Sequence, residues 1–409
     1  MRYSINLFRV VDSLSSALDL VGVDDVQHGK RVGLMAIRAA QSLGWDSERR
    51  DDLLLASFLH DCGVSTTSEH GFLVTELEWS DAQEHCLRGE HLLADVPILA
   101  HLAPFIRYHH TRWQDLAAAG ASTPVAEMAN LIFLSDRLDS LRNDYGPTEA
   151  FAKREEFMAT LAKYDGVLFN PDFTKALAQC AQSEAFWYSL DPQMLEFHVR
   201  QLVSRGHKMT IDQAGLRSVA VMFARIIDAK SAFTADHSVR VARLSKYIAN
   251  GMGLPTDTCD AIEIAGYLHD LGKLRVPDAI LEKHGPLDAV ERMTMNRHSY
   301  DTYEILFRLF GDDSIALWAA YHHEAVNGQG YPFQVSGDDL PLEARIIAVA
   351  DVFQALVQNR PYRDSLPPDR VMAVVDQQTV GGRLDPAVTA FVHAHLDACW
   401  HEAGGNRAA

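Results

Sequence analysis

Two short stretches decide the fold class: "FLHDCGV" at residues 58–64 and "YLHDLGK" at residues 267–273. Both place a His-Asp pair after apolar residues and before a glycine, and only the second ends in lysine. Apolar residues recur at intervals of three and four, for example in 218–229 and 241–254, which predicts amphipathic helices. Alternating β-branched runs are scarce, and the glycines and prolines of 331–341 predict a turn-rich loop. The sequence therefore predicts an all-α protein.

The chain repeats itself around these two stretches. Each copy has a histidine 32 residues before the His-Asp pair, and a later histidine 24 residues before a His-His pair. An aspartate follows each His-His pair within an apolar run. Residue type and spacing recur together, which an accidental match does not produce. The repeated residues are His28, His60, Asp61, His85, His109, His110 and Asp136 in the first copy, and His237, His269, Asp270, His298, His322, His323 and Asp351 in the second.

The repeat predicts two tandem helical-bundle domains that arose by internal duplication. A chain of 409 residues is long enough to bury two separate cores. The repeat period far exceeds that of a solenoid, so each copy is expected to be a whole domain. We place the first domain at 1–185 and the second at 212–400, with a connecting segment at 186–211 that is partly helical.

Composition restricts the class of protein. The formal net charge of −18 disfavours binding to DNA or RNA duplexes, which requires a basic surface. The N-terminus lacks the apolar core of a signal peptide, and no apolar run is long enough to span a bilayer. The five cysteines are scattered without a C-x-x-C pair, as in a reducing compartment. We therefore expect a cytoplasmic protein without a membrane partner; its oligomeric state and protein partners stay open.

The repeated residues are of the types that bind divalent metals. Imidazole and carboxylate ligands without thiolate favour iron or manganese, with magnesium, nickel or zinc as alternatives. Each copy offers too many ligands for one tetrahedral ion and enough for two octahedral ions. If the His-Asp pair lies on a helix, its side chains point about 100° apart, so the carboxylate can bridge two ions. Two such ions can activate water and hold a phosphate, which predicts a hydrolytic centre.

The second copy resembles the HD-GYP domain, a branch of the HD phosphohydrolase superfamily. The resemblance covers about residues 212–390 and rests on "HDLGK" (269–273), "HHEAVNGQGYP" (322–332), "ADVFQAL" (350–356) and "RPYR" (360–363). It implies an all-helical fold and hydrolysis of cyclic dinucleotides in bacterial signalling at a cluster of two or three metals. The substrate of this family is chiefly cyclic di-GMP, and some members prefer 3′,3′-cyclic GMP-AMP.

The resemblance also implies roles for individual residues. The seven repeated residues of the second copy should bind metal, and Lys273 should act beside Asp270 by contacting the scissile phosphate as a point charge. Three-metal members carry a glutamate where this chain has Phe233, which favours two metals. Gln354 stands where the family often has aspartate. The other implied substrate contacts are Gly330, Tyr331 and Pro332 in the signature loop, and Arg360 and Arg363 as a phosphate clamp.

The first copy departs from the family pattern outside its metal-binding residues. It has Val64 in the place of Lys273 and no GYP sequence after its His-His pair. Tyr145 and Thr148 fall where the two arginines would be. The first copy is therefore interpreted as a degenerate HD domain with a second metal site but without the residues that recognise a cyclic dinucleotide. It could be a regulatory partner of the second domain, a nucleotide-binding domain, or a second phosphohydrolase.

The leading hypothesis is a metal-dependent phosphodiesterase whose second domain opens a cyclic dinucleotide to the linear 5′-phosphorylated product. The substrate is 3′,3′-cyclic GMP-AMP, cyclic di-GMP or both, and the sequence does not rank them. One alternative is a bifunctional enzyme whose first domain is a 5′-nucleotidase for the linear product. Another is a cyclic dinucleotide receptor that signals through a partner. A hydrolase of nucleoside triphosphates or alarmones is disfavoured by "NGQGYP" (327–332).

Overall fold

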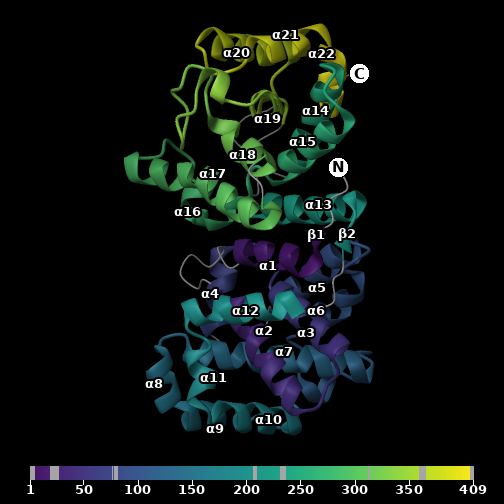
Figure 1. Ribbon diagram of the computed structural model, residues 1–409, viewed down its shortest axis with the longest axis vertical. Coiled ribbons are helices and arrows are strands. Elements are labelled where there is room, and N and C mark those ends of the chain that lie inside the picture. The colour runs from purple at the N-terminus through teal and green to yellow at the C-terminus, as the bar shows by residue number, and fades with distance from the viewer. Residues whose placement is uncertain are drawn as a thin grey trace. The chain divides into compact units, whose positions relative to one another are not determined.

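The chain folds into helices throughout, as the ribbon of the computed structural model shows (Figure 1). The structure describes residues 5–18, 27–75, 77, 82–205, 210–230, 236–311, 314–358 and 365–405. Within this part, contacts divide the chain into a first compact unit that ends at Gly215 and a second that begins at Leu216. The predicted all-α class is confirmed.

The first unit contains the helices up to α12 and one short strand pair. Strands β1 (Ile5–Asn6) and β2 (Thr210–Ile211) pair antiparallel, with Ile5 opposite Ile211. The helices are α1 (Leu7–Leu18), α2 (His28–Ser42), α3 (Ser47–Leu59), α4 (Thr67–Thr75), α5 (Ala82–Ala94), η2 (Ala100–Leu102), α6 (Ala103–Tyr108), η3 (Trp113–Asp115), α7 (Thr123–Arg142), α8 (Pro147–Ala152), α9 (Arg154–Ala162), α10 (Pro171–Ala181), α11 (Glu184–Tyr188) and α12 (Pro192–Arg205).

The second unit repeats the arrangement with its own helices. They are α13 (Gln213–Ala229), α14 (His237–Gly251), α15 (Thr256–Leu268), η4 (Leu271–Arg275), α16 (Asp278–Leu281), α17 (Ala289–Phe310), α18 (Ser314–Ala320), η5 (Tyr321–His323), η6 (Gly337–Asp339), α19 (Leu342–Val357), α20 (Pro368–Val380), α21 (Pro386–Ala394) and α22 (Leu396–Glu402). The predicted turn-rich loop at 331–341 contains only the short η6.

Local sequence explains where the long helices begin and end. Asp288 starts α17 with a capping box, in which its carboxylate accepts from the backbone of Glu291 and the Glu291 side chain accepts from the backbone of Asp288. Gly311 ends the same helix with a φ of 72°, a left-handed conformation that glycine adopts without a steric penalty. Asp46 caps α3 by accepting from the backbone of Arg49.

The two cores are built from corresponding helices. In the first unit α2 packs against both α3 and α7, and in the second α14 packs against α15 and α19. Helix α12, within the connecting segment proposed from the sequence, packs on α2 of the first unit. Among the described residues, no helix has the length and apolar character needed to cross a bilayer. The metal-ligand candidates lie at the start of α2 and α14 and within α7 and α19, so helix packing determines the geometry of the centre.

Candidate metal centres

The His-Asp pairs lie at the ends of helices rather than within them. The α3 helix ends at Leu59 and α15 ends at Leu268, so each histidine is a C-cap and each aspartate lies in the following turn. The glycine two residues after each aspartate lets another part of the backbone approach this turn closely. A Cβ at Gly63 would lie 2.0 Å from the carbonyl oxygen of His85, and one at Gly272 would lie 2.0 Å from that of His298. The helical placement that the sequence analysis considered for the pair does not hold, because each helix ends just before it.

Backbone carbonyls set the tautomer of the clustered histidines. His269, His298 and His322 each place ring Nδ1 between 2.6 and 2.8 Å from the carbonyl oxygen three residues earlier. His60 and His109 make the same contact in the first unit. A carbonyl oxygen only accepts hydrogen bonds, so Nδ1 carries the hydrogen and Nε2 presents its lone pair. These lone pairs face the centre, as metal ligation requires.

In the second unit, the carboxylate of Asp270 lies between two pairs of imidazoles. Its Oδ2 is 3.3 Å from His269 Nε2 and 3.8 Å from His237 Nε2. Its Oδ1 is 3.5 Å from His298 Nε2 and 3.6 Å from His322 Nε2. Each oxygen therefore faces its own pair of nitrogens. This is the arrangement that a carboxylate bridging two cations would adopt.

Asp351 and His323 complete two adjoining groups around Asp270. Oδ1 of Asp351 lies 3.3 Å from His237 Nε2. Within each group, the candidate ligand atoms all lie within 4.8 Å of one another. The structure thus brings together all seven residues that the repeat singled out in the second copy. The two groups are His237, His269 and Asp351, and His298, His322 and His323, and a third group, His269, Asp270 and His322, overlaps both.

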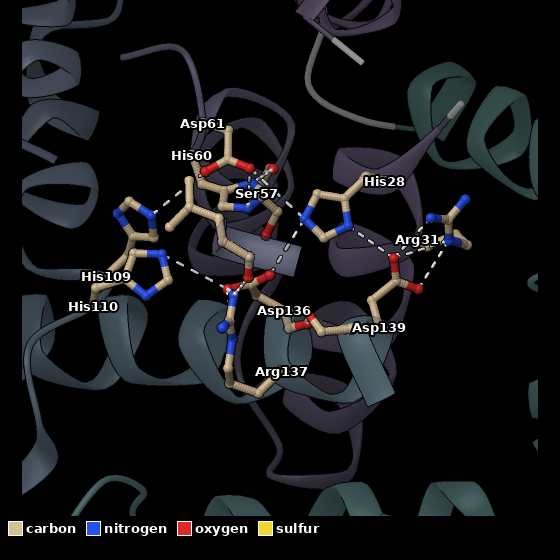
Figure 2. Close-up of polar contacts among 12 residues, drawn as sticks. His28, Arg31, Ser57, His60, Asp61, His109, His110, Asp136, Arg137 and Asp139 are labelled. Carbon is tan, nitrogen blue, oxygen red and sulfur yellow. Dashed lines mark hydrogen bonds and ion pairs between the residues drawn. The ribbon is translucent and has the colours of Figure 1, made fainter. Parts of the chain in front are cut away.

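The first unit has the same construction (Figure 2). Oδ2 of Asp61 lies 3.3 Å from His60 Nε2 and 3.8 Å from His28 Nε2. Oδ1 of Asp61 lies 3.6 Å from His85 Nε2 and 3.9 Å from His109 Nε2. The first copy has therefore kept the geometry of the cluster as well as its residue types.

Asp136 of α7 closes the first cluster from the opposite side. Its Oδ1 lies 3.3 Å from His28 Nε2, and its Oδ2 lies 3.8 Å from His110 Nε2 (Figure 2). The candidate ligand atoms again form two groups. They are His28, His60 and Asp136, and Asp61, His85, His109 and His110.

The polar atoms of both clusters fit divalent cations. In the described part of the chain, the buried Nε2 of His269 and Oδ1 of Asp270 have no hydrogen-bond partner, and the same holds for the equivalent atoms of the first unit. Buried polar atoms in proteins are normally satisfied. Nε2 of His298 also lies 3.3 Å from Nε2 of His322, and two lone pairs at this distance repel unless a positive charge lies between them. A divalent cation would satisfy all of these atoms together.

Burial and neighbouring charges keep the ligands in the form that binds metal. Burial lowers the pKa of His298 to about 4 and that of His322 to about 3. Burial opposes ionisation of Asp270, but the positive charges of His269 and Lys273 outweigh it and hold the Asp270 pKa well below its usual range. In the first cluster, burial lowers the pKa of His85 to about 3 and that of His109 to about 4. At neutral pH His298 and His322 therefore offer neutral imidazoles and Asp270 an ionised carboxylate. Burial opposes protonation of His269, but the charge of Asp270 outweighs it and raises the His269 pKa.

Among the described residues, a basic side chain contacts a candidate ligand carboxylate in each centre. In the second unit, Lys273 of η4 places Nζ 2.5 Å from Oδ2 of Asp270. In the first unit the buried Val64 takes the place of this lysine. The lysine thus distinguishes the two His-Asp turns in space as it does in the sequence.

The basic residue of the first centre comes from another element and was missed by sequence reasoning. Arg137, only 2% exposed, donates to Oδ2 of Asp136 at 2.7 Å and to the carbonyl oxygen of Leu73 at 2.7 Å. The second copy has Val352 at the corresponding position. That difference was the available signal: a charged residue replaces an apolar one directly after a ligand aspartate.

The signature loop packs against the second centre. The ring of Tyr331 lies 4.8 Å from that of His323, measured between centroids. Glu324 is buried, and its carboxylate accepts from the backbone N–H groups of 333–335 at 2.7, 3.2 and 3.1 Å. A Cβ at Gly330 would lie 2.4 Å from Cα of Glu324. Sequence reasoning gave Glu324 no role, and the structure shows that it anchors the loop.

The remaining predicted substrate contacts are placed as follows. Pro332 follows Tyr331 through a cis peptide bond in the signature loop. Arg360 and Arg363 lie outside the described residues, as does Phe233. Their predicted roles stay predictions.

Comparisons with known proteins agree with this geometry. HD domain family models match residues 26–141 and residues 221–388, ranges that contain all fourteen clustered residues. The chain is 36% identical over 396 residues to "3′3′-cGAMP-specific phosphodiesterase 1" of Vibrio cholerae, covering 95% of this chain and 91% of that protein. The chain belongs to the HD-GYP family.

Further relatives match this HD-GYP chain over different lengths. "3′3′-cGAMP-specific phosphodiesterase 3" of Vibrio cholerae is 31% identical over 370 residues, covering 85% of this chain and 79% of that protein. "Cyclic di-GMP phosphodiesterase response regulator RpfG" of Xanthomonas campestris is 38% identical over 177 residues, covering 42% of this chain and 45% of that protein. The crystal structure of V-cGAP3 of V. cholerae has a TM-score of 0.68 at 24% identity, covering 96% of this chain and 98% of that one. This likeness supports the fold.

Proposed function

We propose that this HD-GYP chain is a metal-dependent phosphodiesterase that hydrolyses a cyclic dinucleotide to the linear 5′-phosphorylated product. The chemistry is assigned to the second domain, 212–400. One observation carries the proposal: the second unit combines the His/Asp cluster, Lys273 against the shared carboxylate, and Tyr331 of the signature loop against His323. The first unit has the cluster without this lysine or this loop.

We assign two divalent ions to the second unit, because the two oxygens of Asp270 face different histidines. Nitrogen and oxygen ligands without thiolate favour iron or manganese, with magnesium, nickel or zinc as alternatives. Bound metals would supply Lewis-acid activation of water and neutralise the charge of a phosphate. The ligands are His237, His269, Asp270, His298, His322, His323 and Asp351.

The chain's own residues would orient and stabilise the phosphodiester. Lys273 pairs with Asp270 in the structure, so its ammonium group lies within one side chain's reach of a phosphate held at the cluster. Its positive charge would stabilise the charge that develops on the phosphate oxygens. Tyr331 supplies a ring beside the cluster against which a base or ribose can pack. Arg360 and Arg363 are assigned to the second phosphate of the cyclic substrate.

The comparisons favour 3′,3′-cyclic GMP-AMP as the first substrate to test. Two relatives with that specificity in their names match most of this chain and most of their own length. RpfG, named for cyclic di-GMP, matches 42% of this chain. A product time course with both substrates would decide between them.

The test uses the purified full chain loaded with Mn²⁺ or Fe²⁺ and supplied with an excess of each cyclic dinucleotide. We expect many turnovers to the linear product, and loss of turnover in a His269→Ala/Asp270→Ala variant. The matched control is His60→Ala/Asp61→Ala, which removes the same pair from the first unit and should still linearise the substrate. Near-normal turnover in a folded second-unit variant would exclude the assignment. Binding without turnover by the wild type would instead indicate a receptor.

A second candidate function belongs to the first unit: removal of the 5′-phosphate from the linear product. Two observations favour it. The His/Asp cluster is complete, and the buried Arg137 places a cation against Asp136 in a unit that has Val64 instead of Lys273. The first unit would then act as a phosphomonoesterase. With the linear dinucleotide as substrate, phosphate release should disappear in the His60/Asp61 variant and persist in the His269/Asp270 variant. Failure of the wild type to release phosphate would exclude this function and leave a regulatory or a nucleotide-binding role for this unit.

A further inference from the structure

The two units hold their first ligand histidine with different partners. Nδ1 of His28 lies 2.8 Å from Oδ2 of Asp139, on α7 (Figure 2). Nδ1 of His237 lies 2.5 Å from Oε1 of Gln354, on α19. Asp139 and Gln354 are both fully buried and occupy corresponding positions, three residues after the ligand aspartate of each copy. A carboxylate therefore supports the ligand in one unit and an amide supports it in the other.

An arginine keeps the first partner ionised. Arg31 is buried and donates from Nε to Oδ1 of Asp139 and from a terminal nitrogen to Oδ2, both at 2.8 Å (Figure 2). Arg142 also donates to Oδ1 of Asp139, at 3.3 Å, so two arginines face this carboxylate. The corresponding Arg240 of the second unit is directed elsewhere, donating to the carbonyl oxygen of Gly404 at 3.3 Å. Among the described residues, Asp139 and the arginine behind it support His28, whereas Gln354 contacts His237 and Arg240 does not take the place of Arg31.

The chemical difference concerns which tautomer each partner permits. An ionised carboxylate only accepts hydrogen bonds, so Asp139 requires the hydrogen of His28 on Nδ1 and leaves the Nε2 lone pair for a metal. An amide offers an oxygen on one side and an NH₂ on the other. In the described part of the chain, Nε2 of Gln354 is buried without a hydrogen-bond partner, so no contact there locks its orientation. The reversed amide would favour His237 with its hydrogen on Nε2, which cannot bind a metal.

We propose that the first unit is the high-affinity metal centre of this protein and that Gln354 makes the phosphodiesterase centre the lower-affinity one. This rests on the metal-binding role proposed above. Partners that orient a ligand histidine typically change metal affinity by about 10- to 100-fold. When divalent metal is scarce, the second centre loses its metal first while the first centre stays loaded. Phosphodiesterase turnover then follows the supply of metal, through residues that never touch the substrate.

The first measurement compares the two centres within the full chain. The His269→Ala/Asp270→Ala variant leaves the first centre intact, and the His60→Ala/Asp61→Ala variant leaves the second. Each is loaded with Mn²⁺, dialysed against buffers of graded free Mn²⁺ set by a chelator, and analysed for manganese per chain. We expect the first centre to retain manganese at free concentrations roughly 10-fold or more below those required by the second.

The second measurement exchanges the supporting partners. Gln354→Glu is nearly isosteric and, in the variant that retains the second centre, should tighten Mn²⁺ retention by about 10-fold. Asp139→Asn, in the variant that retains the first centre, should weaken it by about 10-fold or more. Because this change leaves Arg31 buried beside a neutral amide, Asp139→Asn/Arg31→Met is made in parallel, and folding is checked by circular dichroism. Gln377→Glu, an exposed position on α20, controls for the added charge.

The outcomes separate this inference from the proposed function. The affinity difference would be overturned if the two centres were half loaded at the same free Mn²⁺ concentration. It would also be overturned if neither exchange moved that concentration by more than twofold in folded protein. Both results would leave the phosphodiesterase assignment intact. Failure of both centres to hold Mn²⁺, Fe²⁺ or Zn²⁺ would overturn the metal-binding role itself. Weaker Mn²⁺ retention after Asp139→Asn, together with tighter retention after Gln354→Glu, would support the proposal.

Discussion

Replacing Thr302 with valine should weaken the second unit and its His-Asp turn together. The hydroxyl of Thr302, fully buried on α17, accepts from the backbone N–H of Gly272 at 2.9 Å and donates to the carbonyl oxygen of His269 at 3.1 Å. These two bonds join α17, which carries His298, to the turn that carries Asp270. Valine has nearly the same shape as threonine, so Thr302→Val removes the hydroxyl without opening a large cavity.

The magnitude follows from the two backbone groups left without partners. A buried donor or acceptor that loses its hydrogen bond costs about 1–3 kcal/mol. With one N–H and one C=O affected, the free energy of unfolding of the second unit should fall by about 3 kcal/mol. For a unit of this size, 1 kcal/mol lowers the melting temperature by roughly 2–4 °C, so the expected decrease is about 6–12 °C.

The assay is thermal unfolding of the full chain with metal present, alongside phosphodiesterase turnover. Thr389→Val is the matched control: Thr389 is also buried, but its hydroxyl bonds only to that of Thr379, which in turn bonds to the carbonyl oxygen of Val375. The control should unfold within about 0.5 kcal/mol of wild type and keep full turnover. If Thr302→Val melts within 1–2 °C of wild type (about 0.5 kcal/mol) and turns over normally, the turn is not held by this hydroxyl and the reasoning is wrong.

Two further predictions concern the loop and the effect of pH. Gly330→Ala should lower turnover by about 10-fold or more, because its Cβ would lie 2.4 Å from Cα of Glu324, whereas Gly285→Ala, at an open position, should match wild type in the same assay. Metal-stripped protein should lose stability as pH falls from about 6.5 towards 4, because unfolding frees His298 and His322 to bind protons that burial excludes. The slope is about 1.4 kcal/mol per pH unit for each histidine, and urea midpoints that stay equal at pH 7 and pH 5 would contradict it.

Much of the candidate site could be inferred from the repeat. Ligation depends on residue type, and the spacing of histidines and aspartates recurs between the copies, so all fourteen clustered residues were identified before the geometry was known. The all-α class followed from apolar spacing. The sequence did not show that the helix ends before the His-Asp pair, since the backbone that approaches the following turn at Gly272 belongs to His298, which is distant in the chain.

By itself, the sequence determined the helical class, the duplication, the ligand types and the lysine that separates the two copies. Tertiary structure decided how the ligands are supported. Arg31 and Asp139 are 108 residues apart in the chain, and Arg137 reaches the carbonyl of Leu73 across 64 residues. Spacing along a chain indicates which side chains share one helix face, but not which faces meet. Arg31 donates to Asp139, the partner of His28, because packing brings this carboxylate to it. The corresponding Arg240 donates to the carbonyl oxygen of Gly404 instead.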